Sequence, residues 1–334
     1  MKKILSILCS LVILISSIFS INVYAKTEIP IAMALDNNYT MPTIVAMTSM
    51  LENVNSDTVY KFHLLLSGDF KEENKNMILS LKKKYPSKQF EINFIDMKNA
   101  FSWARQSITS ITRPTYFRLY LPNLLREYDK LIYLDGDIIV NKDLSKLWNT
   151  DLKDNYIAGV RNYFRNPNTI YHKYLGIDDL NQYINAGVSL MNLKKLRDDK
   201  MIDKFEWFIK NKINKCKELI MQDQDTINAC CYGKIIILPF EYNFSELLIE
   251  LYNAQNENKK ISLLTSDSTI IHYAHTKPWN NLNSSLAEKW WFYAKKSGIL
   301  NGNLINNMPL NKRIAFRKVI QDAQLKWNFK FDFV

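Results

Sequence analysis

Cysteine is scarce in this sequence. Four cysteines occur among 334 residues, and Cys9 lies in an apolar N-terminal segment. The other three, Cys216, Cys230 and Cys231, are an odd number, and neither a CxxC pair nor a Cys/His metal spacing is present. This pattern argues against a disulfide framework and against a zinc-binding module. We therefore expect three buried thiols in a helical region.

Long apolar runs beyond the N-terminus, internal repeats, low-complexity linkers and nucleic-acid-binding motifs are also missing. These absences favour one globular domain over a membrane-spanning, repeat or nucleic-acid-binding protein. The composition, 47% hydrophobic and 23% charged, is that of an ordinary globular chain. The net charge of +11 suits anionic partners such as phosphorylated substrates or a lipid surface, although a solvated basic surface explains it equally well.

The N-terminus has the pattern of a secretory signal peptide. Two lysines follow the first methionine, residues 4–21 are almost wholly apolar, and Val23 and Ala25 fit the −3 and −1 positions of a cleavage site. We expect residues 1–25 to be removed after export to the periplasm, the exterior or a secretory lumen. The same stretch is about long enough to serve as an uncleaved N-terminal anchor.

Strand and helix patterns alternate in the first third of the chain. Short apolar runs at residues 29–35, 60–66 and 90–95 predict strands, and residues 43–51 and 71–84 have helical spacing. This alternation predicts an α/β fold with a doubly wound, mainly parallel sheet flanked by helices. Ligands of such sheets bind beyond the carboxyl ends of the strands.

A buried apolar strand at residues 131–134 runs directly into Asp135-Gly136-Asp137. The glycine permits a sharp turn, so that both carboxylates can reach one hard cation. Mg²⁺ and Mn²⁺ prefer oxygen ligands and are often shared with a substrate diphosphate. A polar turn that merely closes a strand is the alternative.

Two further groups of residues can carry chemistry. His272 follows an apolar pair and completes a plausible ligand set for Mn²⁺, with His275 as a competitor, and Lys277 can neutralise charge on a leaving diphosphate. Residues 222–225, Gln-Asp-Gln-Asp, precede a helix-like segment. They can face a sugar ring, or they can cap the helix, because acidic side chains satisfy free backbone N–H groups at a helix start.

Six segments together resemble family-8 retaining glycosyltransferases, the group that contains lipopolysaccharide galactosyl- and glucosyltransferases, galactinol synthase and glycogenin. The resemblance covers residues 29–280 in the order of the family. The matching segments are Ala34-Leu35-Asp36-Asn37-Asn38-Tyr39, Thr115-Tyr116-Phe117-Arg118-Leu119, Leu134-Asp135-Gly136-Asp137, Asn185-Ala186-Gly187-Val188, Gln222-Asp223-Gln224-Asp225, and His272-Tyr273 with Lys277-Pro278-Trp279.

The resemblance implies a GT-A-type domain over residues 26–284 that moves glucose or galactose from UDP-glucose or UDP-galactose to a glycan or lipid-linked acceptor. It implies that Asp135, Asp137 and His272 bind Mn²⁺ or Mg²⁺, and that Lys277 binds the diphosphate. Contacts to the donor are implied for Ala34, Asp36, Asn38 and Tyr39 at the uracil-ribose end, for Arg118, and for Asn185, Asp223 and Gln224 around the transferred sugar.

The family retains the anomeric configuration, and two routes stay open. Gln224 sits where the debated nucleophile of the family sits, and Asp225 is the neighbouring alternative. Because an amide is a poor nucleophile, a front-face route in which the leaving phosphate assists the acceptor is the other possibility. Asn162 lies where related enzymes often carry an aspartate. The signal-like N-terminus also departs from bacterial members, which generally work in the cytoplasm.

Residues 285–334 are expected to form a C-terminal helical extension rich in basic and aromatic residues. Residues 312–334 carry six Lys or Arg against two Asp, interleaved with five aromatic residues. This composition suits an anionic membrane surface, and an ordinary helix that packs on the domain is the alternative.

Two other functions are alternatives to the transferase. One is a catalytically silent sugar-binding protein of the same fold, and the other is a metal-dependent nucleotidyltransferase or phosphohydrolase.

Overall fold

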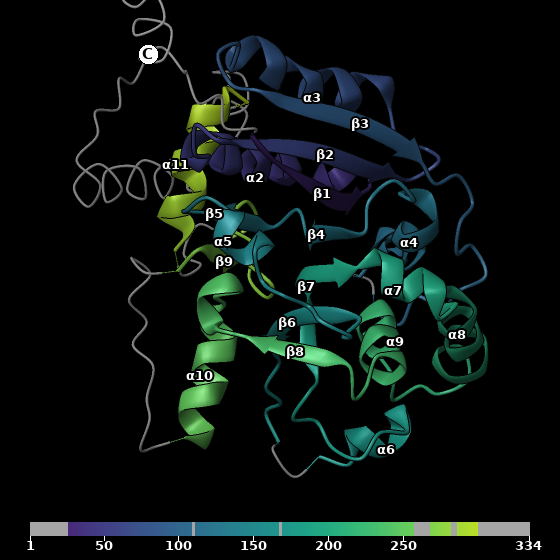
Figure 1. Ribbon diagram of the computed structural model, residues 1–334. Helices are drawn as coiled ribbons and strands as arrows, with labels where there is room; N and C mark the ends of the chain where they lie inside the picture. The colour runs from purple at the N-terminus through teal and green to yellow at the C-terminus, as the bar shows by residue number, and fades with distance from the viewer. Residues whose placement is uncertain (1–25, 109–110, 167–168, 257–267, 282–285, 300–334) are drawn as a thin grey trace, which may run out of the picture.

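The computed structural model describes most of the predicted domain (Figure 1). The described residues are 26–108, 111–166, 169–256, 268–281 and 286–299. The expected signal segment, residues 1–25, and the basic-aromatic stretch, residues 312–334, lie outside them, so both stay predictions. In the described ranges, no helix is long and apolar enough to cross a membrane.

A seven-stranded sheet forms the centre of the molecule, with the strand order β3-β2-β1-β4-β7-β6-β8. β1 to β4 run parallel to one another and β6 runs parallel to β8, whereas β7 is antiparallel to both of its neighbours. The predicted α/β class with a mixed, mainly parallel sheet is confirmed. The strands are β1 (Thr27–Leu35), β2 (Thr58–Leu66), β3 (Phe90–Asp96), β4 (Lys130–Leu134), β6 (Ile157–Arg161), β7 (Ile184–Asn192) and β8 (Ile235–Leu238).

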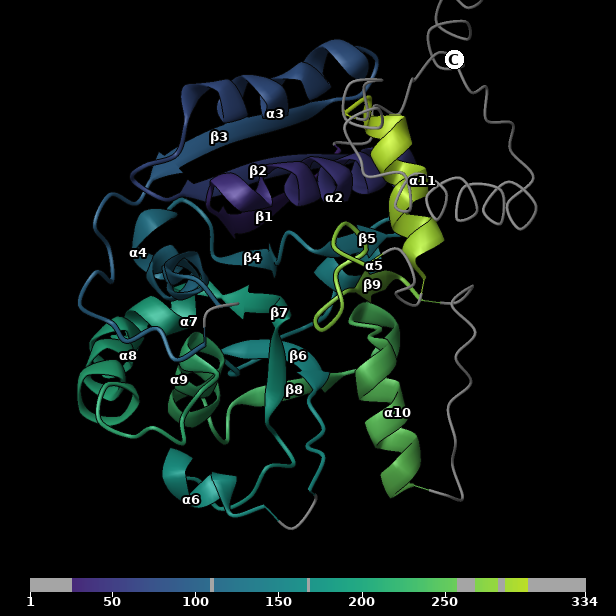
Figure 2. The ribbon, with the colours of Figure 1, turned by 180° about the vertical axis from the view of Figure 1, so that it is seen from behind.

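Helices cover both faces of this sheet (Figures 1 and 2). α2 and α3 contribute to the core on one face, and η2, α7, α8 and α9 contribute to the core on the other. The helices are η1 (Asn37–Tyr39), α2 (Thr40–Asn53), α3 (Glu72–Lys84), η2 (Arg113–Tyr120), α4 (Leu121–Leu124), α5 (Ser145–Trp148), α6 (Tyr171–Leu175), α7 (Leu193–Asp198), α8 (Met201–Phe208), the π-helical η3 (Ile209–Ile213), α9 (Gln222–Cys230), η4 (Phe240–Tyr242), α10 (Glu246–Gln255) and α11 (Ala287–Ser297).

The apolar runs of the strands follow from burial on both faces. Successive side chains of a strand point to opposite sides of the sheet. In β1, Ile29, Ile31 and Met33 pack with α2, and Ala32 packs with η2 on the other face. Strands buried on both sides read as continuous apolar segments, which is why the sequence shows runs here instead of alternation.

A second, two-stranded sheet lies beside the first. β5 (Ile138–Val140) begins directly after Asp137 and pairs antiparallel with β9 (Ile270–His272). α11 packs against α2 and this pair, with Trp290 and Trp291 buried. The first part of the predicted C-terminal extension is therefore packed on the domain, and the boundary at residue 284 stays a prediction.

The three cysteines outside the N-terminal segment are free thiols. Cys231 is buried at the end of α9, and Cys216 and Cys230 are partly exposed. The absence of a disulfide among these three is confirmed, and the expectation that all three are fully buried holds only for Cys231.

Candidate active site

A cavity of about 490 Å³ opens beyond the carboxyl ends of β1 and β4. The chain proceeds outward from β1 to β2 and β3, then returns to β4 on the other side of β1. Such a reversal of strand order creates a crevice at which ligands bind. Of the residues predicted for the site, those that line the cavity are Ala34, Asp36, Tyr39, Arg118, Asp135, Asp137, Asn185, Asp223, Gln224, His272 and Lys277.

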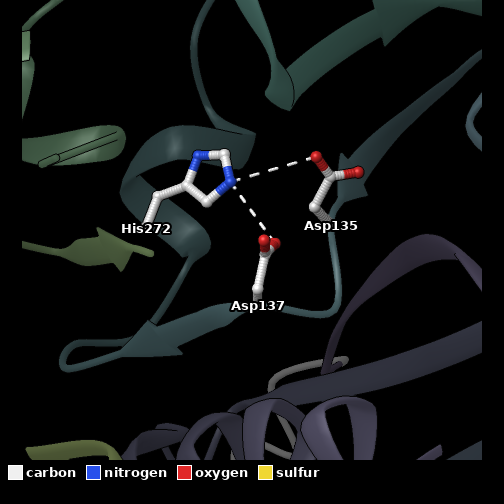
Figure 3. Close-up of side chains that lie close together, drawn as sticks. All are labelled: Asp135, Asp137 and His272. Carbon is white, nitrogen blue, oxygen red and sulfur yellow. Dashed lines mark ion pairs between the residues drawn. The ribbon is translucent and has the colours of Figure 1, made fainter. Parts of the chain in front are cut away.

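The three predicted metal ligands converge in this cavity. Asp135, Asp137 and His272 each offer one ligand atom, and these atoms lie within 4.8 Å of one another. Nε2 of His272 is 3.3 Å from Oδ1 of Asp137 and 3.9 Å from Oδ2 of Asp135 (Figure 3). His275, the competing ligand, lines the cavity but is exposed and does not join this cluster.

Backbone hydrogen bonds of two sheets hold these side chains together. The N–H of Asp135, at the end of β4, donates to the carbonyl oxygen of Gly187 in β7 at 2.8 Å. In the small sheet Ile138 pairs with His272, and the N–H of Tyr273 donates to the carbonyl oxygen of Asp137 at 2.9 Å. The histidine is thus fixed beside a carboxylate that lies 135 positions earlier in the sequence.

Two observations show that these residues fit a divalent cation. Oδ1 of Asp137 is buried and accepts no hydrogen bond, and a buried acceptor without a partner is costly unless something satisfies it. A Cβ on Gly187 would lie 2.3 Å from Cε1 of His272 and 2.6 Å from Oδ2 of Asp135, so only glycine leaves the ligands room. Two carboxylates and an imidazole suit Mn²⁺ or Mg²⁺ with open positions for phosphate oxygens.

Lys277 neutralises the more deeply buried of the two carboxylates. Its Nζ donates to Oδ2 of Asp137 and, at 2.7 Å, to the carbonyl oxygen of Tyr273. Burial is the largest single effect and raises the pKa of Asp137, but Lys277 and His272 together outweigh it and hold this pKa below its usual value. Asp137 is therefore ionised at neutral pH, which is the form that binds a cation.

Arg118 is 2% exposed and links two acidic residues of the cavity. Its Nη2 lies 2.7 Å from Oδ1 of Asp135, and its Nε lies 3.1 Å from Oδ2 of Asp223. Burial raises the pKa of Asp223 to about 6, although Arg118 opposes this shift. Arg118 thus orients two carboxylates, and its predicted contact with the donor stays a prediction.

The turn after β1 is built around Asp36. Its Oδ1 accepts hydrogen bonds from the N–H of Asn38 at 2.9 Å and of Tyr39 at 3.3 Å, and its Oδ2 accepts one from Thr112 at 3.0 Å. Burial, with a further effect from Asp137, raises the pKa of the Tyr39 phenol well above its usual value, so that the hydroxyl stays a neutral donor. Asn38 is exposed and does not line the cavity.

Neighbouring residues of α9 differ in what they face. Gln224 lines the cavity, and its Oε1 accepts a hydrogen bond from the N–H of Ala186 at 3.0 Å. Asp225 does not line the cavity, because the hydroxyls of Tyr183 and Tyr171 donate to its two oxygens at 2.6 and 2.7 Å. The structure therefore brings Gln224 to the candidate site and holds Asp225 away from it.

The two interpretations of residues 222–225 apply to different side chains. Asp225 accepts a hydrogen bond from the N–H of Met221 at 2.9 Å and so satisfies a free backbone N–H at the start of α9. Asp223 and Gln224 face the cavity. Gln222, at the start of α9, has φ 48°, in the left-handed region that costs a non-glycine residue about 1–2 kcal/mol.

Sequence reasoning missed several residues around the cavity. Asn243 is fully buried and hydrogen-bonds both His272 and Asn185. Asn162 was not missed, since the sequence already marks it as a departure from the family pattern, and it lines the cavity. An apolar part of the wall consists of Ile108, Ile111, Met221, Leu247 and Leu248. A lone asparagine and scattered aliphatic residues give no motif, so only the fold shows where they lie.

The fold and the site define a sugar-transferring enzyme of the GT-A class, and the sequence comparisons agree. The profile described as glycosyl transferase family 8 matches residues 30–283. The chain belongs to this family. The resemblance on which the predicted domain was based is thereby confirmed.

Individual relatives share a low sequence identity with this chain, but the similarity extends over most of its length. A Haemophilus influenzae protein described provisionally as a glycosyltransferase is 30% identical over 224 residues, which are 66% of this chain and 64% of that protein. The chain therefore spans slightly less than two thirds of the length of that protein. The lipopolysaccharide 1,2-glucosyltransferase of Escherichia coli is 25% identical over 303 residues, which are 90% of this chain and 84% of that protein. The solved structure of the galactosyltransferase LgtC with donor and acceptor sugar analogues has a TM-score of 0.68 at 26% identity and covers 86% of this chain and 100% of that one.

Proposed function

We propose that this chain transfers a hexose, glucose or galactose, from a UDP-sugar to a glycan or lipid-linked saccharide with retention of configuration, in a reaction that needs Mn²⁺ or Mg²⁺. The observation that carries the proposal is the convergence of Asp135, Asp137 and His272 in a cavity at the carboxyl ends of the strands. A glucosyltransferase and a galactosyltransferase among the similar proteins support the two donor sugars.

When bound, the cation would neutralise the diphosphate of the donor as the glycosidic bond breaks. Lys277, which lies beside Asp137, would donate to the same diphosphate and stabilise the charge that develops on it. Asp36 and Tyr39, at the end of β1, would hold the uracil-ribose portion. Asn185, Asp223 and Gln224 would surround the sugar, and this division of roles follows the family resemblance.

We favour the front-face route for the transfer step. Asp225 is directed toward two tyrosine hydroxyls, and Asp223 is paired with Arg118, so neither carboxylate is free to attack the anomeric carbon. Gln224 offers only an amide, which is a weak nucleophile. In the front-face route the leaving phosphate accepts the proton of the acceptor hydroxyl, and these residues orient the sugar.

Two parts of the proposal rest on the sequence alone. Residues 1–25 would direct the chain out of the cytoplasm. Outside the cytoplasm, the UDP-sugar donor would have to be supplied from another compartment. Residues 312–334 would give a peripheral contact with an anionic membrane near a lipid-linked acceptor.

The proposal is tested by incubating the purified protein with a panel of UDP-sugars in the presence and absence of Mn²⁺, with added saccharides, and water itself, as acceptors of the hexose. We expect release of UDP from UDP-glucose or UDP-galactose only when the metal is present. Release of UMP would indicate a nucleotidyltransferase or phosphohydrolase instead. Binding without release from any donor would indicate a catalytically silent sugar-binding protein.

A further inference from the structure

A chain of hydrogen bonds runs from the backbone of β7 to the ring of His272. The N–H of Gly187 lies 3.0 Å from Oδ1 of Asn185, and Nδ2 of Asn243 lies 2.9 Å from the same oxygen. Oδ1 of Asn243 lies 2.9 Å from Nδ1 of His272. Asn243 and His272 are both buried, so these contacts are shielded from water.

The donor and acceptor of each hydrogen bond in this series follow from the first bond, the one donated by Gly187. A backbone N–H can only donate, so the atom of Asn185 that faces Gly187 must be the amide oxygen. That oxygen needs a donor from Asn243, which places the Asn243 nitrogen toward Asn185 and its oxygen toward His272. An oxygen that faces Nδ1 requires a proton on Nδ1. Nε2 of the neutral imidazole then carries a lone pair.

This assignment matters because Nε2 faces the two carboxylates. It lies 3.3 Å from Oδ1 of Asp137, which accepts no hydrogen bond, and 3.9 Å from Oδ2 of Asp135. With the proton on Nδ1, three electron-rich atoms face one another, and a cation is what stabilises such an arrangement. With the proton on Nε2, the ring would donate to Asp137 and block the position of the cation.

We propose that Asn243, oriented by Asn185, is a positioning residue that keeps His272 in the Nδ1-protonated tautomer and thereby leaves Nε2 free for the divalent cation. This inference rests on the metal role in the proposed function. Hydrogen bonds to the second ligand nitrogen generally fix the tautomer of metal-binding histidines. Here an amide pair takes that role, with Asn185 in β7 and Asn243 directly after η4.

Asn243 is itself fixed relative to the histidine. Its neighbour Phe244 donates its N–H to the carbonyl oxygen of Ile270 at 2.8 Å, and the N–H of His272 donates to the carbonyl oxygen of Phe244 at 2.8 Å. The same short backbone ladder therefore holds the amide and the imidazole. The contact between them does not depend on the conformation of a long side chain.

The tautomer can be read directly by ¹⁵N NMR of the metal-free protein at mildly alkaline pH. The chain has four histidines, and His272 is assigned by the loss of its signals in His272→Ala. We expect a protonated Nδ1 and an unprotonated Nε2 in the wild-type protein. In Asn243→Ala the proton should move to Nε2, and the Kd for Mn²⁺, measured by calorimetry, should rise about 10- to 100-fold.

Two further variants separate this role from general packing. Asn243→Asp keeps an oxygen toward Nδ1, so it should retain the wild-type tautomer and bind Mn²⁺ more tightly than Asn243→Ala. Asn141→Ala removes a partly buried amide that bonds Ser268 near the other end of the β5–β9 pair. It should keep both the tautomer and the Kd of the wild-type protein.

The outcomes distinguish this inference from the proposed function. Wild-type protein that binds no Mn²⁺ would overturn both. Wild-type protein that binds Mn²⁺ but carries the His272 proton on Nε2 when metal-free would overturn the positioning role alone. The same conclusion would follow if Asn243→Ala bound Mn²⁺ as tightly as the wild-type protein.

Discussion

Gly187 offers the sharpest structural test of the metal site. In Gly187→Ala the new Cβ would lie 2.3 Å from Cε1 of His272 and 2.6 Å from Oδ2 of Asp135. Carbon atoms in contact are ordinarily about 3.5–4.0 Å apart, so the ligands must separate by about 1 Å. A displacement of this size costs about 100-fold in rate, which corresponds to about 2.7 kcal/mol. We expect this loss of turnover together with a rise of at least about 10-fold in the Kd for Mn²⁺.

The fold should survive this change, because Gly187 does not have a positive φ and alanine can adopt its backbone conformation. Gly159→Ala is the matched control. Its Cβ would meet the end of the Ile184 side chain at 2.6 Å, in the same sheet, without facing a carboxylate. Calorimetry with Mn²⁺ and an assay of UDP release should separate the two variants. A wild-type Kd in Gly187→Ala would refute the reasoning.

Three other predictions follow from the site. Asp137→Asn should leave the protein folded, as judged by circular dichroism, but abolish Mn²⁺-dependent UDP release, and unchanged activity would contradict its role as a ligand. Lys277→Met should reduce turnover at least about 10-fold and weaken UDP binding, because it removes a charge that faces the diphosphate; equal UDP affinity would argue against this contact. Asp225→Asn should alter the pH dependence of stability. Burial raises the pKa of Asp225 to about 6, whereas an unfolded aspartate titrates near about pH 4. The free energy of unfolding that this group contributes is thus present below about pH 4 and is lost as the pH rises through about 6. Urea unfolding at several pH values should show a smaller decline over this window in Asp225→Asn than in the wild-type protein, and identical slopes would show that Asp225 does not titrate there.

The position of the acidic motif could be predicted from the sequence because local rules suffice for it. A continuous apolar run that ends at Asp135 identifies a buried strand, and the carboxyl end of such a strand is where ligands bind. His272, which follows a second apolar pair, and Lys277 were also predicted from their residue types, and the order of the six family segments supported both although they lie far away in the sequence. All of these side chains line the same cavity.

Features that depend on rotation about a helix or on long-range pairing could not be predicted. In α9, consecutive residues differ in direction by about 100°, so the sequence does not reveal that Gln224 faces the cavity and Asp225 faces two tyrosines. Asn243 reaches His272 only because Phe244 bridges to Ile271 in β9. No local pattern marks that contact, and the same holds for the close approach of Gly187 to the metal ligands.

The most direct measurement is anomalous X-ray diffraction at the manganese edge from crystals soaked with MnCl₂ and UDP. The account predicts one strong peak at about 2 Å from a carboxylate oxygen of Asp135, one of Asp137 and Nε2 of His272, with the UDP phosphates on its open side. Manganese bound elsewhere, or UDP phosphates bound away from these three side chains, would contradict it.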